Sequence, residues 1–138
     1  MNKDYHAILS SLMKDLKPLR ISGKNVQWTD AWAQSGVSEK RLISKTDGMP
    51  FSIILKKFPK KEQLVSKDGY KIHSHPTLEI GYVLKGKVNI YFEDIGEREF
   101  EEGDVVIQPP GLKHAAVSTD EDTIILAINI PPAEWEES

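Results

Sequence analysis

From residue 51 onward, the sequence alternates short β-rich apolar runs with turn-forming Gly, Pro and Asp. The runs that we interpret as strands are 51–58, 70–75, 78–85, 87–92, 104–108, 114–118 and 123–130. Short strands at this density predict an antiparallel sandwich or barrel. Two segments, 80–84 and 123–130, are apolar at nearly every position. We therefore expect them to be central in the sheet or covered by the N-terminal region.

The N-terminal residues 4–17 follow a different period, with apolar side chains three and four positions apart. These are Tyr5, Ile8, Leu9, Leu12, Met13 and Leu16. The spacing predicts an amphipathic helix that Pro18 ends. Its apolar stripe suits either a helix that covers an open end of the domain or one that packs against a partner. His6 is expected at the surface of this helix.

Residues 18–50 show weak periodicity and are interpreted as a connecting region. Trp28 and Trp32 are expected to anchor this segment on the body of the protein. A chain of 138 residues fits a single domain. Within it we expect residues 1–45 to form the helix and a connecting extension, and residues 46–138 to form the barrel.

Composition excludes several classes of protein. With no cysteine, the chain has no disulfide, thiol nucleophile or cysteine-based metal site. A formal net charge of −3 lacks the basic footprint of a nucleic-acid-binding protein. No apolar run approaches the roughly 20 residues of a membrane span. The N-terminal residues are too polar for a signal-peptide core, so we expect a cytoplasmic protein without nucleic-acid or membrane partners.

Candidate chemistry gathers in the β-rich part. His73 and His75 lie two apart on one predicted strand, so both imidazoles project from the same face. Glu79 follows a short turn, and His114 comes directly after the turn at 109–111. A single histidine on a strand is more often a hydrogen-bonded polar group than a ligand. Together, three imidazoles and one carboxylate can supply a set of nitrogen and oxygen ligands for a divalent metal.

The spacing of these residues resembles that of the cupin superfamily. Its first motif, G-x5-H-x-H-x3-4-E-x6-G, is matched by residues 69–86 (GYKIHSHPTLEIGYVLKG). Its second motif, G-x5-P-x-G-x2-H-x3-N, is matched by residues 103–118 (GDVVIQPPGLKHAAVS). Gly69 stands two positions closer to the histidines than in the family pattern, and Ser118 replaces the Asn. The resemblance implies an all-β fold, a double-stranded β-helix or jelly-roll barrel with the N-terminal α-helix added.

The resemblance also implies a metal held by His73, His75, Glu79 and His114. These donors suit Fe(II), Mn, Co, Ni, Zn or Cu, and the sequence does not choose among them. Because the imidazoles must be deprotonated to bind metal, binding is expected to weaken as pH falls through about 6.5.

Cupins include dioxygenases, isomerases, lyases and non-catalytic modules. For this chain the resemblance favours a metal-dependent enzyme on a small organic molecule, with dioxygenation as first choice. The alternatives are an isomerase or lyase on an acidic sugar, and a non-catalytic metal- or ligand-binding module. A homodimer is expected, formed through a sheet face or through an exchanged N-terminal strand near residues 41–43.

Strand alternation predicts which neighbours share the face of the ligands. They are Lys71 beside the histidine pair, Gly81 and Val83 beside Glu79, and Ala116 and Ser118 beside His114. Tyr82 and Tyr91 are candidates for a general acid, although packing would also explain them. Gly86 is expected in a tight hairpin, and Gly111 in the turn that presents His114.

Overall fold

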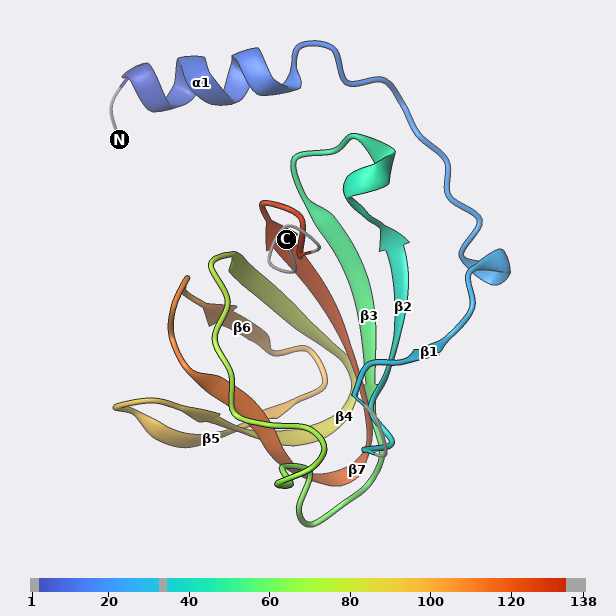
Figure 1. Cartoon of the computed structure of the whole chain (residues 1–138), viewed down its shortest axis with the longest axis vertical. Coiled ribbons are helices and arrows are strands. Elements are labelled where there is room, and N and C mark those ends of the chain that lie inside the picture. Colours follow the sequence, from blue (N-terminus) through green and yellow to red (C-terminus); the bar gives the residue numbers. More distant parts are fainter. Residues whose placement is uncertain (1–2, 33–34, 134–138) are drawn as a thin grey trace.

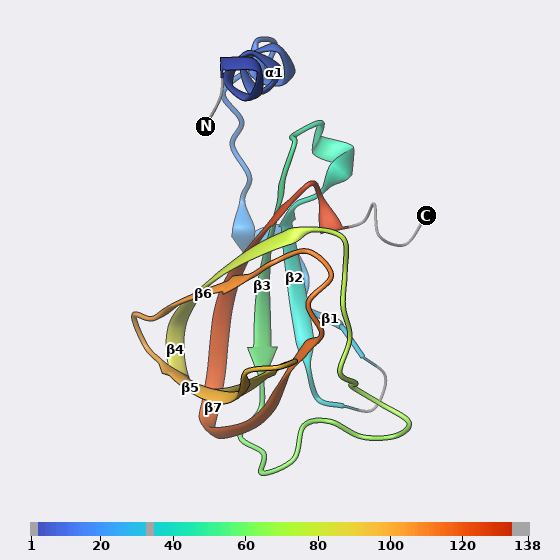
Figure 2. The same ribbon diagram turned by 90° about the vertical axis from the view of Figure 1, so that its left-hand side faces the viewer.

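The computed structural model describes residues 3–32 and 35–133, which form one antiparallel β-barrel preceded by a helix (Figures 1 and 2). The elements are α1 (Lys3–Met13), β1 (Thr29–Asp30), β2 (Ser38–Ile43), β3 (Ser52–Phe58), β4 (Leu78–Phe92), β5 (Gly96–Glu101), β6 (Val105–Gln108) and β7 (His114–Ile130), with short 3-10 helices at Gly23–Asn25 and Lys45–Asp47. The predicted all-β barrel with an N-terminal helix is confirmed.

Two long strands build the barrel. β4 has 15 residues and β7 has 17, and they pair from Leu78–Ile130 at one end to Phe92–His114 at the other. The first half of β4 and the second half of β7 lie in one sheet, in the order β1-β2-β3-β7-β4-β6. The remaining halves form a smaller sheet with β5. Both sheets therefore share the same two strands, which bend from one layer into the other.

The prediction of a hairpin at Gly86 is wrong, because the strand bends there and continues. Residues 78–85 and 87–92 form one strand, and so do 114–118 and 123–130. Gly86 has φ +95°, and a Cβ built there would lie 2.5 Å from the carbonyl oxygen of Asp122 on β7. Glycine is needed here because the two backbones meet closely at a corner, and no turn reverses the chain.

Two further strand predictions are corrected. Residues 70–75 form a loop that touches the sheet through a single bridge between His73 and His114. β5 was not expected, because Glu97, Arg98 and Glu99 are exposed and give the segment no apolar alternation. It is held in place by its pairing with β4 and by Phe100, whose ring packs against Phe92 of the core.

The N-terminal third also differs from the prediction. The connecting region contains β1 and β2, and β2 pairs with β3 as part of the larger sheet. α1 ends at Met13 and does not reach residue 17, and it lies away from the barrel in both views (Figures 1 and 2). Two residues of its apolar stripe, Ile8 and Met13, are 59% and 44% exposed. The helix therefore does not cover an end of the barrel. His6 is exposed, as expected.

The core lies between the two sheets. Its buried side chains are Val37, Phe58, Leu64, Tyr70, Val83, Val88, Ile90, Phe92, Val106, Ala115, Ala116 and Ile125. Val83 and Ala116 are inward-facing, as the alternation predicted. No helix in the described part of the chain is long and apolar enough to cross a membrane.

Candidate metal centre

The three histidines of the β-rich region meet in the structure. His73 and His75 come from the loop between β3 and β4, and His114 is the first residue of β7. The backbones of His73 and His114 exchange two hydrogen bonds, of 3.0 and 2.9 Å, which bring the loop onto the strand. One ring nitrogen from each of the three histidines lies within 4.8 Å of the others. The group is thus close enough to hold one metal ion.

Backbone carbonyls fix the orientation of two of these rings. Nδ1 of His73 lies 2.6 Å from the Lys71 carbonyl oxygen, and Nδ1 of His114 lies 2.9 Å from the Leu112 carbonyl oxygen. A carbonyl oxygen only accepts hydrogen bonds, so each Nδ1 carries the proton. The lone pair is therefore on Nε2, so each of these imidazoles would coordinate a metal through Nε2.

His75 is oriented by a buried polar chain. Its Nδ1 lies 3.2 Å from the Thr77 carbonyl oxygen and 2.9 Å from the Thr77 hydroxyl. That hydroxyl donates to Oδ1 of Asn129 at 3.0 Å, so towards His75 it acts as an acceptor. Nδ1 again carries the proton. Thr77 and Asn129 are fully enclosed, at 0% and 2% exposure, which holds the ring firmly.

Burial keeps His73 and His114 neutral. Removal from water lowers the pKa of His114 to about 4, and it also lowers the pKa of His73. Neutral imidazole is the form that coordinates metal. The cluster is therefore ready for a cation at neutral pH.

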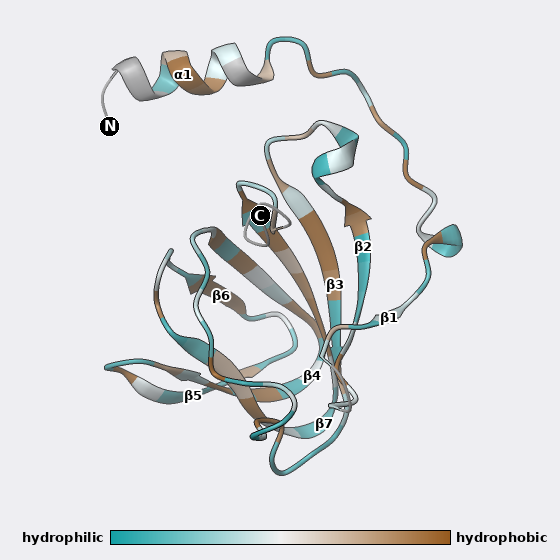
Figure 3. Cartoon of the chain, viewed as in Figure 1, coloured by the Kyte–Doolittle hydropathy of each residue, from teal (hydrophilic) through white to brown (hydrophobic). Residues whose placement is uncertain are grey.

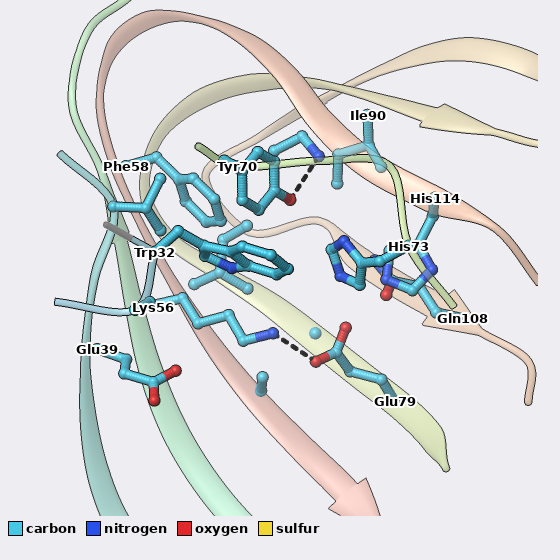
Figure 4. A pocket seen from close by; sticks show the side chains of 16 residues that line it. Trp32, Glu39, Lys56, Phe58, Tyr70, His73, Glu79, Ile90, Gln108 and His114 are labelled. Carbon is cyan, nitrogen blue, oxygen red and sulfur yellow. Dashed lines mark hydrogen bonds and ion pairs between the residues drawn. The ribbon is translucent and has the colours of Figure 1, made fainter. Parts of the chain in front are cut away.

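Glu79 lies beside this cluster and is held by a lysine. Its Oε1 accepts a 2.8 Å hydrogen bond from the Nζ of Lys56 on β3, and its Oε2 lies 3.9 Å from Nε2 of His75. Burial would raise the pKa of Glu79, but the ammonium of Lys56 outweighs it and lowers the pKa to about 2. Burial would lower the pKa of Lys56, but the carboxylate of Glu79 outweighs it and raises this pKa. The pair is therefore a carboxylate and an ammonium, pointing toward each other across the cavity (Figure 4).

The site contains residues that the sequence interpretation did not select. Lys56 was detectable, because it shares the inward face of β3 with Ile54 and Phe58 and is the only charged member of that alternation. Tyr70 was not, because it lies in a loop and not on the expected strand. Its ring and that of His73 both contact Trp32, with centroids 5.4 and 5.3 Å away. Trp32 thus anchors its segment against the site.

Other expected neighbours lie elsewhere. Tyr82 is 43% exposed on the outer face of β4, and Tyr91 alternates with buried residues and also points outward. Neither tyrosine reaches the cavity. Lys71 is exposed and contributes its carbonyl oxygen alone, because residues 70–75 are a loop where strand alternation does not apply. Ser118 accepts a hydrogen bond from Asn89, away from the histidines.

The cluster opens into two adjoining hollows of about 70 and 170 Å³ that share Trp32, Lys56, His73 and Glu79 in their linings. The smaller one extends inward among Phe58, Ile90 and Ile125, and the larger one leads outward past Glu39 and Arg41. Together they have room for several waters or a small organic molecule.

Gln108 adds a polar group that lacks a partner. It lies on β6 opposite Glu79, is 8% exposed and lines the smaller hollow beside His114. Its side-chain oxygen is buried without a hydrogen bond from any described residue. Buried polar atoms are rarely left so, and a bound molecule in the hollow would supply the missing donor.

The fold and the histidine cluster define a small β-barrel protein with a polar, histidine-lined cavity. Residues 63–129, which contain the three clustered histidines, match the model of the cupin domain family. No curated protein matches the chain.

Solved structures share the fold at low identity. KdgF from Halomonas sp. superposes with a TM-score of 0.67 at 20% identity, covering 84% of this chain and 97% of its own. An RmlC-like cupin from Shewanella frigidimarina gives 0.65 at 20% identity, with 85% and 95% covered. The polyketide cyclase RemF from Streptomyces resistomycificus gives 0.65 at 18% identity, with 83% and 80% covered. Such likeness shows the fold and leaves the reaction to be argued from the site.

Proposed function

We propose that this cupin is a metal-dependent enzyme that acts on a small organic acid. His73, His75 and His114 would hold a divalent transition metal, with Glu79 as the fourth donor. The observation that carries the proposal is the shared tautomer of the three clustered imidazoles, each with Nδ1 donating to a carbonyl and Nε2 directed to coordinate. A metal held there supplies a Lewis acid for a carbonyl or carboxylate oxygen.

Charge in the cavity favours an anionic substrate. Three neutral imidazoles add no charge, and the ammonium of Lys56 cancels the carboxylate of Glu79. At the mouth, Arg41 and Glu39 form a second balanced pair at 2.9 Å. A divalent ion in this site would therefore keep a net local charge near +2. Without Lys56, the ion, the histidines and Glu79 would together have a net charge of about +1. A carboxylate or enolate is the ligand that this charge selects.

Groups that hold protons favour isomerase or lyase chemistry. The hydroxyl of Tyr70 accepts a 3.0 Å hydrogen bond from the backbone N–H of Ala116, and no described residue uses its own proton. Burial raises the pKa of Tyr70, so this proton stays in place at neutral pH. Lys56 and Glu79 line the same hollow. Tyr70 and the Lys56 ammonium can thus donate protons to one bound molecule.

Dioxygenation is the second candidate. It is favoured by the apolar inner end of the smaller hollow, where Phe58, Ile90 and Ile125 offer no polar group. An apolar chamber beside the histidines suits dioxygen better than it suits a second polar substrate.

The test starts with elemental analysis of protein purified without added metal or chelator. The metal content should be stoichiometric, should be lost in His75→Ala and should persist in His6→Ala, which changes an exposed histidine outside the cluster. The metal-loaded protein is then assayed with small keto acids and uronic acids, with and without oxygen. Turnover without oxygen supports isomerase or lyase chemistry. Turnover that consumes oxygen assigns a dioxygenase, and a thermal shift without turnover assigns a binding module.

A further inference from the structure

Four polar side chains form one row across the inner face of the larger sheet. The strand register places Glu79 between Asn129 of β7 and Gln108 of β6. On its other side, Asn129 is paired with Ser52 of β3. Residues paired in register point to the same face and lie side by side. β3 and the second half of β7 are otherwise largely hydrophobic (Figure 3), so a polar row here needs an explanation.

All four side chains are buried, so their oxygens need hydrogen-bond donors. Three of these oxygens accept from another part of the described chain. The pairs are the Ala133 N–H with Ser52, the Thr77 hydroxyl with Asn129, and the Lys56 ammonium with Glu79, at 3.0, 3.0 and 2.8 Å. Gln108 is the exception, because its Oε1 meets no donor from any residue that the structure describes. The missing donor is at the end of the row that lines the smaller hollow.

Small residues in the next row keep this hollow open beside Gln108. Gly81 of β4 is paired with Ala127 of β7, so the middle of that row carries only a hydrogen atom and a methyl group. The hollow of about 70 Å³ has room for about five to seven non-hydrogen atoms, at roughly 10–15 Å³ for each. A small organic molecule can therefore lie within reach of the Gln108 oxygen.

Two side chains bring donor protons to the same hollow. The Lys56 ammonium has three N–H groups, of which Glu79 is the acceptor for one, and the Tyr70 hydroxyl keeps its proton. Lys56 lies on β3 and Gln108 on β6, so the two face the hollow from opposite sides (Figure 4). The described walls thus offer donors at Lys56 and Tyr70 and an acceptor at Gln108.

We propose that the molecule bound here is a hydroxy acid whose hydroxyl group donates a hydrogen bond to Oε1 of Gln108. Its carboxylate accepts hydrogen bonds from Lys56 and Tyr70. A keto acid has no proton to donate to Gln108, and an amino acid brings an ammonium group close to Lys56 and the metal. Gln108 is then the residue that selects the substrate class, a role that rests on the proposed function.

Lactate and propionate test this role, because they differ by a single hydroxyl group. Calorimetry on the Co(II)-loaded full chain should show that lactate binds about tenfold or more tightly than propionate. In Gln108→Met the lactate affinity should fall about tenfold or more, because the acceptor of its hydroxyl is gone, while the propionate affinity should change less than about twofold. Gln63→Met changes an exposed glutamine in a loop and should behave like wild type.

Lys56→Met should give a different result. It removes a donor to the carboxylate that both acids share, so both affinities should fall by a similar factor and the preference for lactate should remain. The affinity for Co(II) alone, followed by its visible absorption, should be the same in Gln108→Met and in wild type. A lower Co(II) affinity in Gln108→Met would make Gln108 a metal ligand and overturn the proposal.

The same measurements separate the role of Gln108 from the proposed function. A preference for lactate that persists in Gln108→Met, or a wild type that binds Co(II) and shows no preference, overturns the role of Gln108 and leaves the metal site in place. A wild type that binds neither Co(II) nor either acid overturns the proposed function and the role of Gln108 together.

Discussion

At the scale of single residues, Lys56 decides the charge of the cavity. It is the cation that holds Glu79 ionised, and its neighbour Lys57 points outward on the same strand, so the two lysines form a natural comparison. The motif spacing alone implies that Glu79 is a metal ligand, and it indicates no charged side chain paired with Glu79. In the structure, Glu79 already accepts a hydrogen bond from Lys56. This bond makes its carboxylate oxygens weaker donors to a metal ion.

Replacing Lys56 with methionine should lower the free energy of unfolding of the metal-free protein by about 2–3 kcal/mol, because it leaves a buried carboxylate unpaired. Lys57→Met should cost less than about 1 kcal/mol. Urea titration measures both. Added metal should restore more stability to Lys56→Met than to wild type, since the cation then neutralises Glu79. Equal effects of the two substitutions would show that the Lys56–Glu79 pair has no special role.

A substitution of Gln108 should affect ligand binding without lowering the stability of the protein. Gln108→Met removes a buried oxygen without a partner and keeps the side-chain volume, so the free energy of unfolding should be unchanged or higher by about 1 kcal/mol. Affinity for small hydroxy acids, measured by calorimetry on metal-loaded protein, should fall at least tenfold. A variant that binds those acids as well as wild type would remove Gln108 from the ligand site.

The positions of the histidines could be predicted from the sequence, because motif spacing constrains them directly. Lys56 was also readable, as the charged residue in an apolar alternation. Tyr70 could not be predicted, and Trp32 could be predicted as an anchor but not as a neighbour of His73, because these contacts depend on loop paths that no periodicity encodes.

At the scale of elements, the two corner-turning strands depend on Gly86. An alanine there would place its Cβ 2.5 Å from the Asp122 carbonyl oxygen at a φ of +95°. Gly103 has nearly the same φ, +93°, with no atom within 4 Å of its Cβ position.

Gly86→Ala should therefore lower the free energy of unfolding by about 4 kcal/mol, from backbone strain and overpacking together. Gly103→Ala should cost roughly 1–2 kcal/mol, from strain alone. Thermal and urea denaturation compare the two. Similar losses would mean that the close contact between β4 and β7 relaxes easily.

The sequence predicted where β structure lies but divided it wrongly. Turn residues at 86 and 120–122 favoured breaks, yet they mark the corners at which β4 and β7 pass between sheets. Glycine tolerates a corner and a hairpin equally, so composition could not choose between them. β5 was not predicted because Phe100 is its one large apolar side chain, which is too few to give an alternating pattern.

At the scale of the whole molecule, burial of the cluster links stability to pH. His114 has a pKa of about 4 in the folded protein and about 6.5 when unfolded. The unfolded chain binds the proton more tightly, so unfolding is favoured as pH falls from 6.5 toward 4. Below about 4.5 the lowered pKa of Glu79 continues the loss of stability.

For metal-free protein, the urea midpoint should fall between pH 6.5 and pH 4, and the fall should be smaller in His114→Gln. Because burial already disfavours the charged imidazole, proton competition with metal should set in below the pH of 6.5 expected from the sequence. A midpoint that does not change over this range would show that His114 is solvated in the folded state.

The hydrogen bonds that orient the three imidazoles have a consequence for the evolution of this protein. Backbone carbonyl oxygens accept the hydrogen bonds from His73 and His114, and the carbonyl oxygen and hydroxyl of Thr77 both accept from His75. Every residue has a backbone carbonyl oxygen, whatever its side chain. Most changes at positions 71 and 112 therefore preserve the anchors. Mutation can reshape the chamber wall at Phe58, Ile90 or Ile125 while the anchors stay fixed. In a framework of this kind the shape of the cavity can change by small steps while the histidine cluster keeps its geometry.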